Sequence, residues 1–155
     1  MHMDAIDHRI IEVLQQNADL TNAELAARVN LSPSSCLRRV RRLKEEGVIT
    51  RTVALVDPDR LGRGLTAVVE VTLERHGAEA QQHFLDLLTA EPAVTQVYSV
   101  TGETDVLLVI HLVDMKEYQE ICNRLFNHDP NVVKFRTLFA MERLKFETAV
   151  PVAGG

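Results

Sequence analysis

The sequence has few of the residues that build disulfides, metal centres or membrane spans. It contains two cysteines, two tyrosines and no tryptophan, and aromatic residues make up 5% of the 155. Cys36 and Cys122 lie far apart within helical patterns, so we interpret them as small core residues rather than a disulfide or metal site. No apolar run reaches the ~18 residues that a membrane span needs, and no basic, apolar leader begins the chain. These absences predict a cytoplasmic protein.

Positive charge is also scarce overall, but it is concentrated in one segment. The net charge is −5, and residues 53–155 carry nine basic against fifteen acidic residues. Residues 28–51, in contrast, carry seven basic and two acidic residues. A positive cluster on an otherwise acidic chain favours a small anion-binding module joined to an unrelated domain.

Three short helices are predicted for residues 1–52. Apolar residues recur at helical spacing from Asp4 onward, and TNAEL has the capping-box pattern led by Thr21. The third helix begins in SPSS with Ser32 as its N-cap and ends at Gly47. The next segment, VITRTVALVD, has the pattern of a strand or hairpin. Three capped helices followed by a strand predict a winged helix-turn-helix.

The third predicted helix has an apolar stripe and an opposite polar face. At about 100° per residue, the stripe consists of Cys36, Leu37, Val40 and Leu43. The opposite face offers hydroxyls in its first turn and guanidinium groups behind them, as a recognition helix in a major groove does. A basic face can also be merely solvated, but the three capped helices favour DNA.

The predicted DNA contacts follow from this face. Base contacts are predicted from Ser34, Ser35 and Arg38. Phosphate contacts are predicted from Arg39, Arg41 and Arg42. Ser32 at the start of the helix and Arg51 near the wing complete the predicted DNA-binding set.

The remaining chain is predicted to be a linker strand (53–64) and a second domain (65–155). Strands are predicted at 65–74, 93–101, 105–113 and 131–146, the last possibly two, and helices at 78–91 and 114–129. The first of these helices is predicted to bury Ala80, Phe84, Leu87 and Leu88. The order βαββαβ with right-handed crossovers gives an antiparallel sheet with both helices on one face, a ferredoxin-like arrangement in an α+β protein. The bare face needs cover, which predicts a homodimer.

The residues also resemble a known family. DHRIIEVLQQNADLTNAELAARVNLSPSSCLRRVRRLKEEGVI is similar to the winged helix-turn-helix of the Lrp/AsnC (feast/famine) transcription regulators, and VTGETDVLLVI resembles the glycine–aspartate signature of their effector domain. The resemblance runs from about Asp4 to Lys145. It implies a regulator that binds double-stranded DNA, dimerises through the ferredoxin-like domain and often assembles further, for example into octamers. It also implies that an amino acid or related metabolite binds between dimers.

By this resemblance the signature residues are Gly102 and Asp105. Their neighbours in the implied effector site are Tyr98, Ser99, Val100, Thr101, Glu103 and Thr104, with Thr137, Leu138 and Phe139 from a neighbouring subunit. An amino acid's ammonium needs an acceptor such as Asp105, and its carboxylate needs N–H groups that a glycine turn exposes. Alternatively, Gly102 only supplies a positive φ and Asp105 caps the turn. Thr104 replaces an aromatic residue of many relatives, which changes the shape of the pocket.

Two other functions stay open from the sequence. Siroheme decarboxylases resemble the family over both domains and bind a tetrapyrrole through histidines and arginines. The histidines here are His2, His8, His76, His83, His111 and His128. No pair has metal-ligand spacing, and no Ser/His/Asp or Cys/His arrangement occurs, so we predict no catalytic residue, metal or cofactor. The second alternative is an architectural DNA-binding protein without an effector.

Overall fold

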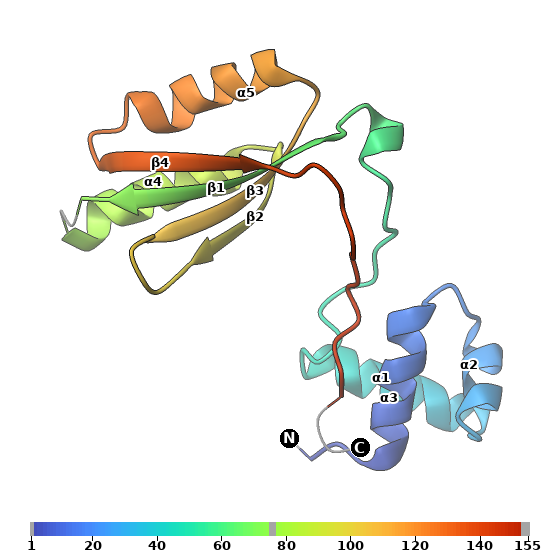
Figure 1. Ribbon diagram of the computed structural model, residues 1–155. Helices are drawn as coiled ribbons and strands as arrows, with labels where there is room; N and C mark the ends of the chain where they lie inside the picture. The colour runs from blue at the N-terminus through green and yellow to red at the C-terminus, as the bar shows by residue number, and fades with distance from the viewer. Residues whose placement is uncertain (1, 75–76, 153–155) are drawn as a thin grey trace. The chain divides into compact units, whose positions relative to one another are not determined.

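The structure, a computed structural model, describes residues 2–74 and 77–152. The chain forms two compact units (Figure 1). Among the described residues, one unit comprises the chain up to Leu55 together with the segment from Leu144 onward, and the other comprises Val56–Arg143. The tail therefore lies with the first unit, whereas the sequence analysis placed it in the second domain.

The first unit is built from the three predicted helices, which are α1 (Ala5–Gln16), α2 (Asn22–Arg28) and α3 (Pro33–Glu45). Each has a side-chain cap at its N-terminus, and the capping box of Thr21 and Glu24 is present in α2. Gly47 adopts a φ of 75° just after α3, and Val48 N–H donates to Leu43 O at 2.9 Å. This is the Schellman pattern expected at a helix-terminating glycine. The buried core of the unit consists of Ile10, Leu25, Ala26, Val29, Cys36 and Leu43.

The predicted strand after α3 is not formed. Residues 50–56 adopt no regular secondary structure, and a short 3₁₀ helix, η1 (Asp59–Leu61), follows. A strand is defined by its ladder of hydrogen bonds to a neighbour, and the sheet of this chain does not extend to this segment. Its apolar side chains, Val53, Leu55 and Val56, are exposed.

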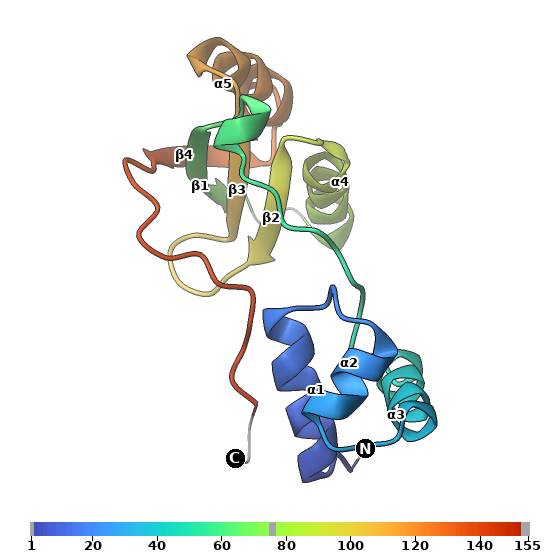
Figure 2. The same cartoon turned by 90° about the vertical axis from the view of Figure 1, so that its right-hand side faces the viewer.

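The second unit contains one four-stranded antiparallel sheet and confirms the ferredoxin-like prediction. Its strands β1 (Leu65–Leu73), β2 (Val94–Ser99), β3 (Val106–Leu112) and β4 (Val132–Phe139) lie in the order β2-β3-β1-β4 (Figure 2). The helices are α4 (Gly77–Ala90) and α5 (Met115–Cys122), and α5 continues as a π-helical turn, η2 (Asn123–Asn127). β4 ends at Phe139, and the described residues beyond it form no further strand.

Alternation along the central strands divides the sheet into two faces. Ala67, Val69, Val71 and Leu73 of β1 are buried together with Val106, Leu108, Ile110 and Leu112 of β3. Phe84 and Leu88 of α4 and Ile121 of α5 belong to the same core, so both helices cover the same face. The period of two in a strand then directs the intervening residues to the other face.

The other face of the sheet is apolar, and none of the helices among the described residues packs on it. The pairings Tyr98–Leu107, Val68–Val109 and Val68–Leu138 place these five residues side by side on it. Tyr98 and Leu138 are exposed, and the other three are half-buried. An ion pair between Arg136 and Glu70 lies on the same face. We call this surface the open face.

Two adjacent leucines of α4 provide a test of this packing. Leu88 is fully buried, whereas Leu87, which the sequence analysis predicted to be buried, is 38% exposed because it lies a full 100° around the helix from Leu88. Leu88→Ala should lower the free energy of unfolding by about 2–5 kcal/mol. Leu87→Ala, the matched control, should lower it by less than about 1 kcal/mol. Denaturant unfolding at one fixed protein concentration measures both, and equal losses would contradict the assigned packing.

Candidate DNA-binding and effector sites

The predicted DNA-binding residues form two stripes on α3. Ser34, Arg38 and Arg41 are spaced i, i+4, i+7 and all three side chains are exposed. We call this the outward stripe. Ser32 caps the helix by accepting from Ser35 N–H at 3.3 Å, and Asn22 Nδ2 donates to Pro33 O at 2.8 Å. The second bond fixes the start of α3 against α2, as the turn of a helix-turn-helix requires.

The second stripe, Ser35, Arg39 and Arg42, is turned toward α1. Arg39 Nη1 donates to both oxygens of Asp4, at 2.9 and 2.8 Å, and to Asp7 Oδ1 at 2.9 Å. Arg42 forms an ion pair with Asp7. The angular analysis placed Arg42 among the outward residues and predicted phosphate contacts for both arginines. The structure instead joins both guanidinium groups to carboxylates of α1.

The carboxylates of α1 owe their position to the helix cap. Asp4 is the N-cap of α1, and Asp4 and Asp7 form a capping box in which each side chain accepts from the other's backbone N–H. The N–H of Asp7 and the Arg39 guanidinium lower the pKa of the Asp4 carboxyl from 3.8 to about 2. The carboxylates of Asp4 and Asp7, which accept from the Arg39 guanidinium, raise the pKa of Arg39. The sequence analysis placed Asp4 only at the start of the first helix.

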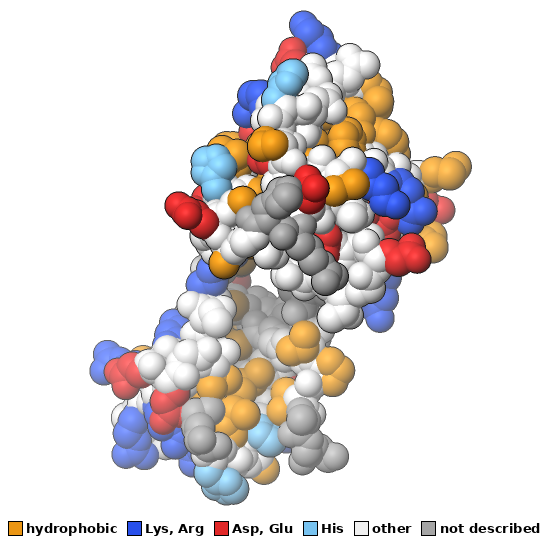
Figure 3. Space-filling model, turned by 90° about the vertical axis from the view of Figure 1, so that its left-hand side faces the viewer, with side chains coloured by type: hydrophobic (Ala, Val, Ile, Leu, Met, Phe, Trp, Pro, Cys, Tyr) orange, Lys and Arg blue, Asp and Glu red, His pale blue; other side chains and the backbone are white. Residues whose placement is uncertain are grey.

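Leu37 is a further residue whose position the sequence analysis misjudged. It was predicted to be part of the buried stripe, but its side chain is 40% exposed. It lies at the edge of the stripe, one turn before Arg41, where α1 and α2 no longer cover it. Arg51 is exposed and lies outside any helix or strand. Figure 3 shows basic side chains gathered along one edge of this unit, in the lower part of the view.

The predicted effector residues before β3 form the turn of the β2–β3 hairpin. Val100 N–H donates to Asp105 O at 3.0 Å, and Gly102 has a φ of 113°, which favours glycine. Thr101, Gly102 and Glu103 are exposed. Tyr98 and Ser99 end β2, and the Tyr98 hydroxyl donates to Gln96 Oε1 at 2.8 Å. Thr104 is half-buried.

Asp105 connects this turn to the neighbouring strand. Its Oδ2 accepts from Leu73 N–H at 2.8 Å, and its own N–H donates to Val71 O at 3.0 Å. The carboxylate thus accepts a hydrogen bond from β1 and does not cap the turn in which it lies. Asp105 also borders a hollow of about 410 Å³ whose other lining residues are Leu73, Glu74, Gly77, Ala78 and Gln81. Small-molecule sites have volumes of about 300–1,000 Å³.

The predicted residues of β4 are not brought to Asp105 within one chain. Thr137 pairs with Val69 of β1, two to four residues from the positions that Asp105 contacts, or roughly 7–13 Å along the strand. Thr137 and Phe139 face α5, where the Tyr118 hydroxyl bonds Thr137 Oγ1 at 2.5 Å and its ring packs edge-on against Phe139. Leu138 points to the open face.

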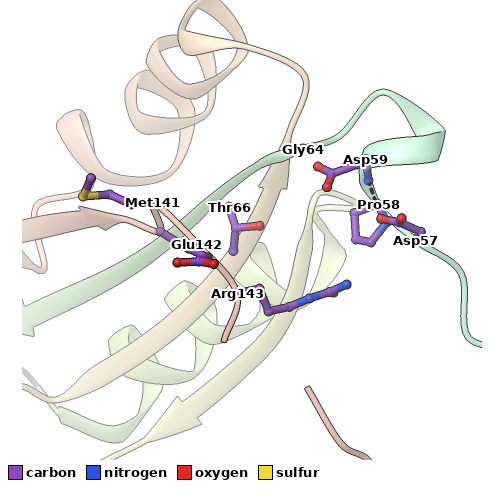
Figure 4. A pocket seen from close by; sticks show the side chains of 9 residues that line it. Asp57, Pro58, Asp59, Gly64, Thr66, Met141, Glu142 and Arg143 are labelled. Atoms are coloured by element: carbon purple, nitrogen blue, oxygen red, sulfur yellow. Dashed lines mark hydrogen bonds between the residues drawn. The ribbon is translucent and has the colours of Figure 1, made fainter. Parts of the chain in front are cut away.

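A second hollow of about 410 Å³ contains none of the predicted site residues. Figure 4 shows Asp57 and Asp59 on the segment before β1, and Glu142 and Arg143 on the segment after β4. Thr66 and Met141 also line it. Its charged residues have both signs and lie outside the sheet and the α-helices. The described residues include no group of three or more His, Cys, Asp or Glu side chains placed to hold a metal ion, and their helices include none suited to cross a membrane.

A helix-turn-helix with an exposed basic stripe, joined to a ferredoxin-like unit, defines a DNA-binding regulator with a separate second domain. Family profiles identify it further. The winged helix-turn-helix DNA-binding profile matches residues 3–50, and the Lrp/AsnC ligand binding domain matches residues 66–150. The chain belongs to the Lrp/AsnC family of transcriptional regulators.

Individual relatives are similar to this protein over nearly the whole chain. It is 36% identical to the DNA-binding transcriptional activator DecR of Escherichia coli over 97% of its length and 99% of that protein's. It is 36% identical to the leucine-responsive regulatory protein of Haemophilus influenzae, covering 92% and 86% of the two chains. A transcriptional regulator from Neisseria meningitidis, solved in complex with L-Met, has a TM-score of 0.91 at 33% identity and 97% coverage of both chains.

The low pKa of Asp4 predicts a specific pH dependence. A carboxyl whose pKa is lower in the folded state stabilises the fold above about pH 4, and this contribution is lost as the pH falls toward 2. Asp4→Asn keeps the capping oxygen and removes the charge. The variant should therefore be less stable than the wild type at pH 5–6, and the difference should narrow below pH 4. Thermal unfolding from pH 2 to 6 measures this, and a difference that is independent of pH would contradict it.

Proposed function

We propose that this regulator binds its DNA sites as a homodimer through the outward stripe of α3 and responds to a free amino acid held at Asp105. The observation that carries the effector part is the carboxylate of Asp105 at the edge of a hollow of about 410 Å³. DNA binding is proposed because Ser34, Arg38 and Arg41 are all exposed on the same side of α3.

In the proposed DNA complex the first turn of α3 meets base edges. Ser34 and Arg38 read bases, with Ser35 beside them, and Arg41 and Arg51 contact phosphates. Leu37 lies next to this stripe and is suited to contact a thymine methyl group. Ser32 contributes by capping the helix whose first turn enters the groove. Arg39 and Arg42 are assigned to α1 rather than to DNA.

The open face supports a second copy of the chain as its cover. It presents Val68, Leu107, Val109, Tyr98 and Leu138 without a helix of its own. Exposed apolar patches of this kind mark interaction surfaces, and twofold pairing is the commonest closed arrangement. A dimer would also carry two α3 helices for two half-sites about one helical turn apart. We also propose assembly beyond the dimer, for example into an octamer, because the proposed effector site lies between dimers.

The chemistry of a free amino acid matches the hollow beside Asp105. A carboxylate accepts at about four positions, so Asp105 can bind an ammonium group while it holds Leu73. Gly77 and Ala78 line the same hollow and belong to the first turn of α4. The first N–H groups of a helix have no partner within the helix and attract a carboxylate. The L-Met complex of the Neisseria relative supports an amino acid as the class of effector.

In this proposal Thr137, Leu138 and Phe139 belong to a neighbouring subunit's side of the site. Their distance from Asp105 within one chain fits a ligand that lies between subunits. Effector binding would then change the assembly or the spacing of the recognition helices, which must match the spacing of the DNA half-sites. The exposed turn of Thr101, Gly102 and Glu103 is available for such a contact.

We also propose that the protein is not an enzyme and that it acts in the cytoplasm. The named relatives are transcriptional regulators, and no feature of the two hollows favours the tetrapyrrole chemistry of a siroheme decarboxylase. Cys36 and Cys122 are free and buried, which suits a reducing compartment. An architectural DNA-binding protein without an effector would show no stabilisation by any amino acid in the thermal-shift screen described below.

Arg38 and Arg41 provide a matched test of the DNA contacts. Arg38→Ala should weaken binding to a duplex selected from random sequences by about 1–3 kcal/mol more than binding to unselected DNA. Arg41→Ala should weaken binding to both duplexes equally, because a phosphate contact carries no sequence information. Fluorescence anisotropy at one fixed salt concentration measures both, and equal losses for Arg38→Ala would make it a phosphate contact.

Asp105→Asn tests the effector site without removing the hydrogen bond to β1. The amide oxygen can still accept from Leu73 N–H, but the charge that would bind an ammonium group is lost. In a thermal-shift screen of the twenty amino acids, beginning with L-Met, wild-type protein should be stabilised by about 2.7 kcal/mol at 100 times the dissociation constant. Asp105→Asn should lose this shift. Glu120→Gln, which removes the same charge from an exposed position of α5, should keep it. A normal shift in Asp105→Asn would refute the assigned site.

A further inference from the structure

The most deeply buried charged group of the DNA-binding unit is Asp7. Its side chain is 1% exposed, and no other charged residue among those described is classed as buried. Although it belongs to the first turn of α1, its carboxylate contacts two arginines of α3. Oδ1 accepts from Arg39 at 2.9 Å, and Oδ2 accepts from Arg42 and from Asp4 N–H, the latter at 3.1 Å. A carboxylate this far removed from water is stable only when such partners surround it.

Both arginine side chains are turned toward α1 and partly buried. The Arg39 side chain is 22% exposed and the Arg42 side chain 42% exposed. The Nε–H groups of both are buried and have no hydrogen-bond partner within the described part of the chain. Leaving a buried donor unsatisfied is unfavourable, so the ion pairs with Asp4 and Asp7 are what hold both groups in place.

We infer that Asp7 is a positioning residue that divides the arginines of α3 into two functional sets. It withholds Arg39 and Arg42 from the phosphates, and by binding both it fixes the rotation of α3 on α1, so that Ser34, Arg38 and Arg41 face outward. Two guanidinium groups and the carboxylates of Asp4 and Asp7 are neutral together, so this patch adds no net charge to the DNA-binding surface. The inference rests on the proposed DNA contact of the outward stripe.

The salt dependence of DNA binding distinguishes the two sets of arginines. For B-DNA, log K falls with log salt concentration with a slope of about −0.9 for each phosphate neutralised. Arg41 and Arg42 are adjacent residues of the same type on the same helix, which makes them matched variants. Arg41→Gln should reduce the slope by about 0.9 for each chain bound, and Arg42→Gln should leave it unchanged. Titrations of the full-length protein on an unselected 30-base-pair duplex at several salt concentrations provide the slopes.

Asp7→Asn should have the opposite effect. A neutral amide no longer holds Arg42, which becomes available to phosphates, whereas Arg39 keeps its two bonds to Asp4. The slope should therefore steepen by about 0.9 for each chain bound. Preference for the selected duplex over unselected DNA should fall, because α3 loses its fixed rotation. Glu12→Gln is the control: it removes the same charge from the exposed side of α1 and should leave the slope unchanged. A merely structural residue would change stability without changing the slope.

The outcomes separate this inference from the proposed function. Equal reductions for Arg41→Gln and Arg42→Gln would overturn it, as would an unchanged slope for a folded Asp7→Asn. If neither arginine variant changes the slope, the proposed contact of the outward stripe with DNA is itself wrong. Should Asp7→Asn fail to fold, the comparison of Arg41→Gln with Arg42→Gln still decides, because Arg42 is partly exposed and Asp7 then keeps Arg39 as its partner.

Discussion

A sheet with helices on only one face is the constraint on which the rest of this protein depends. The crossovers that lead through α4 and α5 return to the same side of the sheet, so Ala67, Val69 and Val71 are buried inside the unit. Val68 and Val109 face the other way, among apolar neighbours. Among the described residues of the second unit, no helix packs over them. In the proposed dimer, a second copy of the chain would cover these residues. The same dimer would supply two recognition helices for two DNA half-sites.

The helices could be predicted because their determinants are local. Thr21 with Glu24, and Gly47 with Val48, act over at most five residues, and these patterns are readable in the sequence. The antiparallel sheet with both helices on one face also followed, because the handedness of crossovers leaves few arrangements. The strand after α3 was wrongly predicted for the opposite reason. Apolar β-branched residues favour a strand, but a strand forms only beside a partner, and the single chain offers none to residues 50–56.

The candidate sites could be predicted only where one element determines them. Helical angle was sufficient to turn Arg38 and Arg41 outward. It could not place Arg39 and Arg42, because their partners on α1 lie 32 to 35 residues away in the chain. The same limit applies to Asp105, whose carboxylate binds a backbone N–H 32 residues distant. The resemblance to the family predicts a ligand contact for this aspartate, and the structure adds a hydrogen bond from its carboxylate to β1.

The chain connects the two units at two places. The chain passes from one unit to the other near Val56 and returns near Leu144. In the returning segment, the backbone of Val150 forms two hydrogen bonds with the side-chain amide of Gln15 in α1. Gln15 Nε2 donates to Val150 O at 2.9 Å, and Gln15 Oε1 accepts from Val150 N–H at 2.7 Å. Val150 is therefore bound to the same helix that carries Asp7.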